Sequence, residues 1–491
     1  MKIKGLRWWI IGLIILITII NYLDRGTLNY MWIANVEYKL VNKFDDSDSY
    51  QALYSPTTNS YLLKNSRGKV VEKSADKIHL KEDSQIVTNR EGIAYDLGFI
   101  SDELSQEEAS NEAKNILGTI TIFFMIAYGI SQLFSGKLYD KIGTRKGFTV
   151  SVLIWSSADA LTSLVRGKNS LTFFRMMLGL GEAGPWPGTT KSNAEWFPQK
   201  ERAFAQGLFN AAASFGSILA PIIILMLYLS VGWRITFVVV GGLGLFWLIP
   251  WLIINKRGPK EHPWITDKEK DYILSGQPEA DTTNVDKGKS WKELLSNKKN
   301  YSVILGRFFL DPIWWMYVTY LPMYLTSQFN LNIKELAFSA WIPYLGAMIG
   351  SLLGGWFSGF LIKKGNSVNK SRKIALLTGG LIMIPAIIGS VLTQDAFIAI
   401  ILMAFVLGGY QFVMTNIQTL PSDLHLGKSV GSLAGLGGAA AVLGTIIAIL
   451  FAGEISSWAL LFGLLVVLVP LSLISIFITV GKIEQIKTNT N

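Results

Sequence analysis

The chain has 491 residues, of which 50% are hydrophobic and only 16% are charged. It contains no cysteine, which excludes disulfides, thiolate metal ligands and a cysteine nucleophile, and its three histidines lie too far apart in sequence to suggest a metal site. The formal net charge is +10, but Lys and Arg fall in short loops between apolar runs, a pattern that sets membrane orientation and needs no nucleic-acid partner.

The apolar runs are long enough to cross a lipid bilayer. The first set of six is predicted near residues 7–31, 113–135, 147–166, 168–189, 203–231 and 234–255, and the second near 301–326, 336–362, 373–393, 395–418, 430–452 and 456–480. This pattern predicts an all-α membrane protein with twelve transmembrane helices. Residues 1–255 would form one six-helix bundle, residues 256–300 a cytoplasmic linker, and residues 301–491 a second bundle.

The short loops that are rich in Lys and Arg predict the orientation. They are the N-terminus, residues 137–146, 191–202 and 363–373, and the tail with Lys482 and Lys487. We therefore expect both termini to be cytoplasmic, in a bacterial inner membrane. Within the linker, Thr266 and Glu269 have the spacing of a capping box, which predicts the start of a short helix.

A polar insertion of about residues 37–112 separates the first two predicted spans. Residues 36–114 contain 10 basic and 15 acidic side chains, a net charge of −5, so the rest of the chain carries +15. The acidic balance favours an extracytoplasmic insertion. It could fold as a hairpin and a helix, or remain mobile, and its sequence does not distinguish the two.

A gating motif follows the second predicted span. The segment from Gly136 to Lys146 contains Asp140, Gly143 and Arg145, and it resembles the loop motif of the major facilitator superfamily. The glycines permit a tight turn and close helix contact, and the charged groups can exchange ion pairs as two bundles separate. In the second half Gly359 stands where an acid is expected, which predicts that the first half holds the stronger latch.

Three predicted spans contain both an acid and a base. Charged groups in the hydrocarbon cost about 2.5–3.5 kcal/mol each on insertion scales, so they need a partner or a function. The pairs are Asp24 and Arg25, Arg175 and Glu182, and Arg307 and Asp311.

Two interpretations of these pairs stay open. The charges could simply neutralise one another within the bundle. Alternatively, Arg25 binds the carboxylate of a substrate, Asp24 and Glu182 are proton sites, and Arg175 tunes Glu182. An anion that binds Arg25 would weaken its hold on a neighbouring carboxylate, so that proton and anion favour each other's binding.

Several motifs resemble the anion:cation symporter family, and within it the hexuronate (glucuronate or galacturonate) transporters. The similarity covers nearly all of the chain except the insertion. It is carried by Tyr22-Leu-Asp-Arg25, the stretch from Arg175 to Pro187, Lys191, Glu195-Trp-Phe-Pro198, Glu201-Arg202-Ala203, Lys4-Gly-Leu-Arg-Trp8, Glu261-His-Pro-Trp-Ile-Thr266 and Asp311-Pro-Ile-Trp-Trp315.

The resemblance implies roles for individual residues. The substrate-contacting arginine and the proton-linked groups of the family fall on Arg25, Asp24, Arg175 and Glu182, and a cavity tyrosine falls on Tyr128. The glutamine that galactonate carriers use on the fifth helix is replaced by Ala213, which argues against a galactonate-type pocket.

Further substrate contacts are predicted from their positions in the spans. They are Tyr22, Asn210, Trp314, Trp315, Gln411 and Asn416. Aromatic rings suit the apolar face of a sugar, although such rings also serve as packing or interface anchors. Polar groups on the tenth span fit either sugar hydroxyls or interhelical hydrogen bonds.

The function predicted from these features is import of an organic anion, a hexuronate, by proton symport through alternating access. The alternatives are a carrier of another sugar acid, such as an aldarate, an aldonate or a uronate oligosaccharide, sodium coupling, or a sensor that binds without transport. No enzyme activity and no cofactor are expected, because no nucleophile–base pair or phosphate loop is present. Twelve helices suffice for a monomer.

Overall fold

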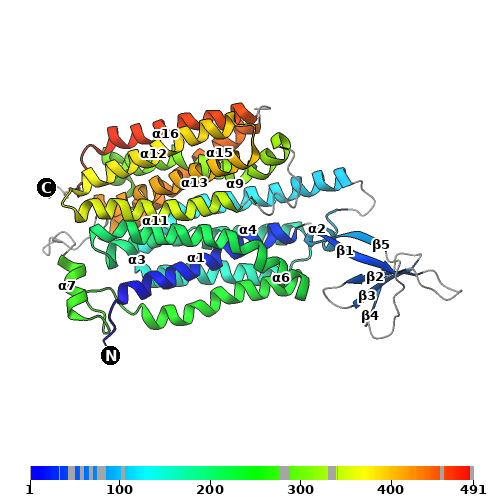
Figure 1. The fold of residues 1–491 in the computed structure, drawn as a ribbon. Coiled ribbons are helices and arrows are strands. Elements are labelled where there is room, and N and C mark those ends of the chain that lie inside the picture. Colours follow the sequence, from blue (N-terminus) through cyan, green and yellow to red (C-terminus); the bar gives the residue numbers. More distant parts are fainter. Residues whose placement is uncertain are drawn as a thin grey trace.

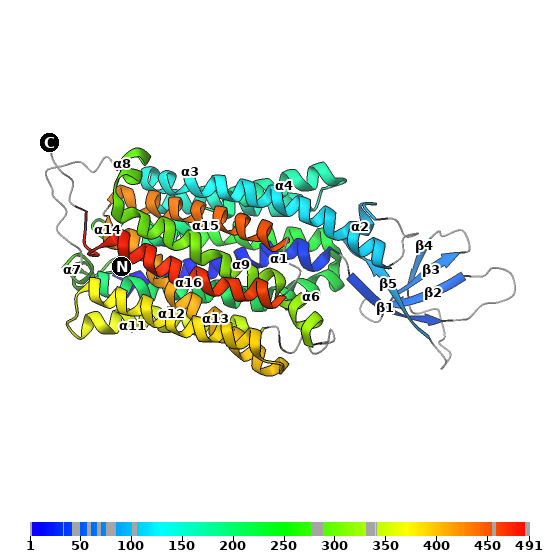
Figure 2. The same cartoon turned by 90° about the horizontal axis from the view of Figure 1, so that it is seen from above.

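The computed structural model describes residues 2–32, 34–41, 50–55, 60–65, 70–74, 85–100, 106–275, 288–329, 339, 341–425, 427–453 and 458–486. Long helices run side by side, and a small sheet projects from one end of them (Figure 1). We call this the insertion end. Both chain termini lie at the opposite end, which we call the terminal end (Figures 1 and 2).

The first half of the helical body consists of α1 (Leu6–Met31), α3 (Gln106–Thr162), α4 (Lys168–Glu182), α5 (Pro185–Trp196) and α6 (Gln199–Ile254). Gly143 interrupts α3 with φ 81°, and Gly232 interrupts α6 with φ 75°. This left-handed backbone is easily adopted only by glycine, so each residue marks the turn between two consecutive helices.

The second half consists of α9 (Tyr301–Phe329), α11 (Ile342–Lys363), α12 (Val368–Leu392), α13 (Ala396–Ile417), α14 (Leu420–Leu424), α15 (Val430–Gly453) and α16 (Trp458–Val480). The two halves meet mainly where α11 packs on α6 and α15 packs on α3.

The number of spans agrees with the prediction. Among the described residues, eight helical segments are long and apolar enough to cross a membrane. Two of them, α3 and α6, each contain two helices separated by the glycine turn. Together with α9 and the α4–α5 pair, the described residues contain twelve membrane-length segments. The first residues of the predicted eighth and twelfth spans, 336–338, 456 and 457, lie outside the described residues, as does Lys487.

The insertion contains a sheet, so the all-α description holds for the helical body alone. The strands are β1 (Ala34–Val41), β2 (Tyr50–Ser55), β3 (Ser60–Asn65), β4 (Val70–Ser74) and β5 (Gln85–Glu91). They pair in the order β4-β3-β2-β1-β5, and every pair is antiparallel. The sequence left a single hairpin with a helix, or a mobile segment, as its alternatives. A short helix, α2 (Ile93–Asp96), follows the sheet.

The linker contributes two short helices, α7 (Asp267–Ser275) and α8 (Trp291–Ser296). The predicted cap at Thr266 is half formed: its hydroxyl accepts from the Glu269 amide at 3.3 Å. The Glu269 carboxylate instead accepts from the backbone amides of Leu6 and Arg7 at 3.0 and 3.2 Å. The linker therefore satisfies amides at the start of α1 that have no partner within that helix.

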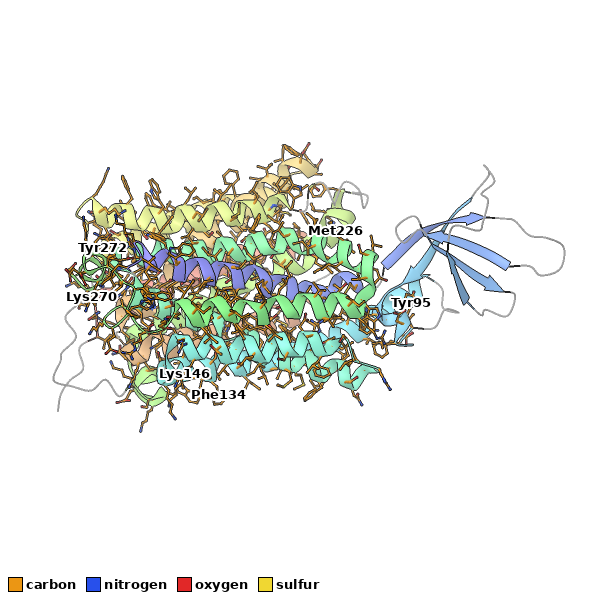
Figure 3. The ribbon with its side chains drawn as sticks, turned by 90° about the horizontal axis from the view of Figure 1, so that it is seen from below. Tyr95, Phe134, Lys146, Met226, Lys270 and Tyr272 are labelled. Atoms are coloured by element: carbon orange, nitrogen blue, oxygen red, sulfur yellow. The ribbon has the colours of Figure 1, made fainter. Side chains whose placement is uncertain are left out.

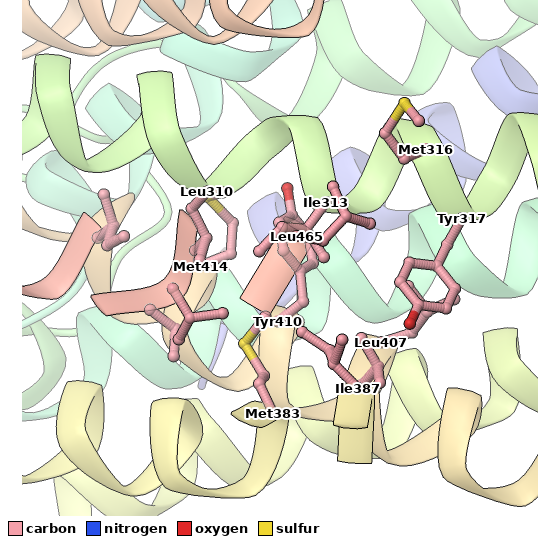
Figure 4. Close-up of a cluster of buried hydrophobic side chains, with 14 of the residues drawn as sticks. Leu310, Ile313, Met316, Tyr317, Met383, Ile387, Leu407, Tyr410, Met414 and Leu465 are labelled. Carbon is pink, nitrogen blue, oxygen red and sulfur yellow. The ribbon is translucent and has the colours of Figure 1, made fainter. Parts of the chain in front are cut away.

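Apolar side chains fill the interior of each half and also cover its outside. In the second half a buried cluster includes Leu310, Met383 and Leu407, drawn in Figure 4. On the outside, Phe134 and Met226 are 57% and 66% exposed, and lie on the helical surface in Figure 3. Large apolar groups exposed along the length of the helices are expected of a surface that faces lipid.

Candidate functional site

A polar cavity lies between the two halves, near the middle of the helices. It contains about 560 Å³ of empty space, counting its opening to solvent. Residues from both halves line it: Tyr22, Arg25, Tyr128, Gln132, Trp186, Asn210, Arg307, Asp311, Trp314, Trp315, Tyr410, Gln411, Met414, Gln418, Gly438, Ala441 and Val442. Polar groups placed among aromatic rings are typical of a ligand site.

Arg25 is the cationic group on the first-half wall of this cavity. Its Nε donates to Oε2 of Glu182 on α4 at 2.7 Å. The guanidinium carbon lies 5.2 Å from the ring centre of Tyr22 and 5.1 Å from that of Tyr128. The Glu182 side chain is fully buried, whereas that of Arg25 remains 16% exposed. An anion in the cavity could therefore reach Arg25 but not Glu182.

Asp24 and Arg175 lie behind this ion pair and not on the cavity wall. Asp24 accepts from the indole Nε1 of Trp155 at 2.9 Å. Arg175 forms an ion pair with Asp159 on α3, with Nη2 3.9 Å from Oδ1. The predicted tuning of Glu182 by Arg175 therefore stays a prediction, and Asp159 joins the group.

The second-half wall combines aromatic rings with an ion pair. The Trp314 ring stacks on Tyr410 with centroids 5.4 Å apart, and Trp315 also lines the cavity. Arg307 donates to Asp311 at 3.0 and 3.3 Å, one helical turn along α9. A flat aromatic surface beside fixed charges matches the apolar face and the hydroxyl groups of a sugar ring.

Two side-chain amides of the first half donate hydrogen bonds to the second half beside the cavity. Asn210 donates to Thr415 at 3.1 Å, and Gln206 donates to Gln418 at 2.9 Å. Gln411 lines the cavity, and its Oε1 has no hydrogen-bond partner among the described residues. Asn416, which the sequence also suggested as a substrate contact, is turned away and donates to carbonyls of α11 and α13.

The predicted gating motif joins the two halves at the terminal end. The Asp140 carboxylate accepts from the backbone amides of Gly431 and Ser432 at 3.0 and 2.6 Å, and from Lys191 Nζ at 3.1 Å. These amides lie at the start of α15, where a helix favours negative charge. Gly136 fits against Gly431, where any larger side chain would collide with the backbone.

The other two members of the motif act within the first half. Gly143 makes the turn inside α3. Arg145 donates to the Leu252 carbonyl at 3.0 Å, whereas the ion pair of Asp140 is with Lys191.

The second half holds its own latch at the same end, built around Arg372. This buried guanidinium donates to Asp423 at 2.8 Å and to Ser358 at 2.8 Å, and it reaches the Gln199 carbonyl of the first half at 3.3 Å. Arg202 donates across to the Ser422 carbonyl at 2.6 Å. The expectation of a weaker second latch missed this arrangement, because its acid comes from α14 and not from the position of Gly359.

Three residues beside the cavity or the latches were not predicted from the sequence: Asp159, Gln132 and Asp423. Asp159 and Gln132 are polar residues in apolar helices. Because burying such groups in a membrane protein is costly, their positions in the sequence could have indicated a function. Asp423 lies just beyond a predicted span, so its sequence position gave no sign that it is fully buried beside Arg372.

Two helical bundles around a central polar cavity, with latches between them at one end, define a membrane transporter and not an enzyme. The major facilitator superfamily profile matches residues 86–438, and the chain belongs to this family. The match begins near the end of the insertion sheet.

Sugar-acid carriers are among the similar proteins. The hexuronate transporter of Escherichia coli (strain K12) is 28% identical over 93% of this chain and 89% of its own length. The galacturonate transporter of Dickeya chrysanthemi is 29% identical over 79% of this chain and 92% of its own length. Among solved structures, the proton:xylose symporter XylE has a TM-score of 0.65 at 12% identity, with 98% of this chain and 97% of that chain covered, and thus shares the fold.

Proposed function

We propose that this transporter imports a sugar acid, most specifically a hexuronate, together with a proton. The observation that carries the proposal is Arg25: it lies on the cavity wall and is held by a fully buried acid on another helix. A carboxylate of the substrate would bind Arg25 and weaken its bond to Glu182. Asp24 and Glu182 are then the candidate proton sites, with Arg175 beside them. The similarity to hexuronate and galacturonate transporters supports the choice of substrate.

The second bundle would bind the sugar itself. Trp314 and Trp315 offer ring faces, and Gln411 offers an amide oxygen without a partner among the described residues. Tyr22, Tyr128 and Asn210 complete the contacts on the other wall. We retain Asn416 only as a residue that orients α13, since its amide is used within the bundle.

Alternating access would proceed by release of the terminal-end latches. Asp140 is the switch, and Gly136, Gly143 and Arg145 shape the loop around it. We place both termini in the cytoplasm of a bacterium and the insertion outside, on the distribution of basic loops. A monomer with one cavity suffices for this cycle.

The test is uptake of labelled glucuronate and galacturonate by proteoliposomes under an imposed proton gradient. We expect accumulation that collapses when a protonophore is added, and competition by hexuronates that exceeds competition by glucarate or galactonate. Binding without accumulation would identify a sensor, and stronger competition by glucarate or galactonate would identify another sugar acid as substrate. Accumulation driven by a sodium gradient alone would replace the proton as the coupling ion.

A further inference from the structure

Asp159 is a buried acid on α3 beside the proposed proton sites. Its side chain has no exposed surface, and neither of its carboxylate oxygens receives a hydrogen bond from any described residue. The Asp24 carboxyl is within hydrogen-bonding reach of it, and Asp24 is itself fully buried, with Oδ1 lacking a donor. Two carboxyl groups therefore face each other in the protein interior.

The charges around this carboxyl pair do not balance. Arg175 and Glu182 approach the pair from α4, and Arg25 from α1 holds Glu182. From α6, the ring centre of Phe237 lies 5.3 Å from the guanidinium carbon of Arg175. The indole N–H of Trp155 donates a hydrogen bond to Asp24.

With every group ionised, the three acids and two arginines carry a net charge of −1. An unbalanced charge in a buried site is costly, and one bound proton removes it. Glu182 already has a 2.7 Å bond to Arg25, whereas Asp159 has only a 3.9 Å approach to Arg175. Two carboxyl groups in contact do not both ionise readily, so the proton belongs to the pair.

We propose that Asp159 and Asp24 form a carboxyl pair that shares one proton, and that this pair must be protonated before an anion binds at Arg25. The proposal rests on the proposed function and deepens it. Protonation brings the cluster to neutrality, and the bound monoanion returns the site to a total charge of −1. After release of the anion, loss of the proton leaves the same charge of −1 for the return step. One proton therefore accompanies each monoanion, and the cycle moves no net charge.

The pair predicts a specific pH dependence of binding. Above the pH at which the pair loses its proton, one proton must be taken up with each anion, so the Kd for glucuronate rises about tenfold per pH unit. In Asp159→Asn the cluster is neutral without a proton, and the Kd becomes nearly independent of pH in this range. Asp159→Glu restores the slope. Asp96→Asn is the matched control. Like Asp24, Asp96 accepts a hydrogen bond from an indole N–H, that of Trp233 at 2.6 Å, but it lies outside the cluster.

Two measurements decide the proposal. Calorimetric binding of glucuronate across pH gives the slope, and infrared spectra of the substrate-free protein at neutral pH detect a protonated carboxyl. We expect that infrared band in the wild type, and not in Asp159→Asn or Asp24→Asn. A wild-type slope that persists in Asp159→Asn, or an infrared band that persists in it, overturns the proposal.

Transport assays separate this outcome from failure of the proposed function. Asp159→Asn should exchange labelled glucuronate across the membrane but lose accumulation driven by the proton gradient. If the variant accumulates glucuronate as the wild type does, Asp159 has no part in coupling and proton symport stands. If the wild type itself neither accumulates glucuronate nor shows a pH slope, proton symport fails.

Discussion

The ion pair between Arg25 and Glu182 stabilises a carboxylate that has no contact with water. Arg25→Ala removes the partner of a fully buried carboxylate whose other oxygen, Oε1, already lacks a hydrogen-bond donor among the described residues. Leaving one member of a buried ion pair unpaired costs about 3–5 kcal/mol of folding stability. Glu182→Gln removes the unpaired charge, so the double variant should recover most of that loss.

Thermal unfolding of purified protein in detergent, with and without glucuronate, measures this cycle. We expect the unfolding temperature to be highest for the wild type, lower for the double variant and lowest for Arg25→Ala. Glucuronate should stabilise neither variant that lacks Arg25. Arg234→Ala, which removes an arginine outside the cavity whose guanidinium lies 4.0 Å from the ring centre of Trp233, is the control. A double variant no more stable than Arg25→Ala would refute the reasoning, because the cost would then not come from the stranded charge.

The remaining predictions concern the latch, the linker and the insertion. Asp140→Asn weakens charge-assisted hydrogen bonds between the two halves that contribute about 1.5–3 kcal/mol each. A single cysteine placed at the buried Ala434 should therefore react with a maleimide at least about tenfold faster in this variant, and an unchanged rate would contradict the role of Asp140 in the latch. Burial lowers the pKa of His262 below its usual 6.5, despite an opposing bond to the Ile254 carbonyl, and its Nδ1 accepts from the Trp264 amide. The unfolded chain therefore binds more protons than the folded protein near and below pH 6.5, so the stability of the protein falls on acidification. The unfolding temperature of His262→Gln should vary less with pH over that range than that of the wild type. Replacing residues 36–89 by Asn-Gly joins Asn35 to Arg90, which are paired across β1 and β5. Glucuronate binding should survive this deletion if the sheet has no part in the binding site.

The sequence predicted the membrane architecture well because lipid imposes a simple rule. Backbone groups in a bilayer must form their hydrogen bonds inside the protein, and an apolar run of about twenty residues does so as a helix. The glycine turns at Gly143 and Gly232 also fall between predicted spans. The insertion gave no such rule, since strand pairing among polar segments depends on partners far apart in the chain, such as Ala34 and Glu91.

The sequence suggested many of the residues at the site and the pair of Arg307 with Asp311, but not the bond between Arg25 and Glu182. Charges in apolar runs pointed to Arg25, Glu182 and Arg307, and all three lie at or beside the cavity. Adjacent residues on a helix point in different directions, so Asp24 and Arg25 have different partners although they are neighbours in sequence. Asp24 faces Trp155 and Asp159 on α3, while Arg25 turns to the cavity. Only the packing of α1 against its neighbours could assign those partners.

The clamp between α7 and α1 has a consequence for watching the carrier at work. Glu269 binds the first amides of α1 and also Arg7 at 3.0 Å, while Tyr272 donates to Glu201 on α6 at 2.6 Å. A dye attached to the exposed side of α7 would thus move together with the first bundle. Paired with a second dye at the end of α12, it would turn each rocking step into a change in energy transfer, without any label inside the substrate path.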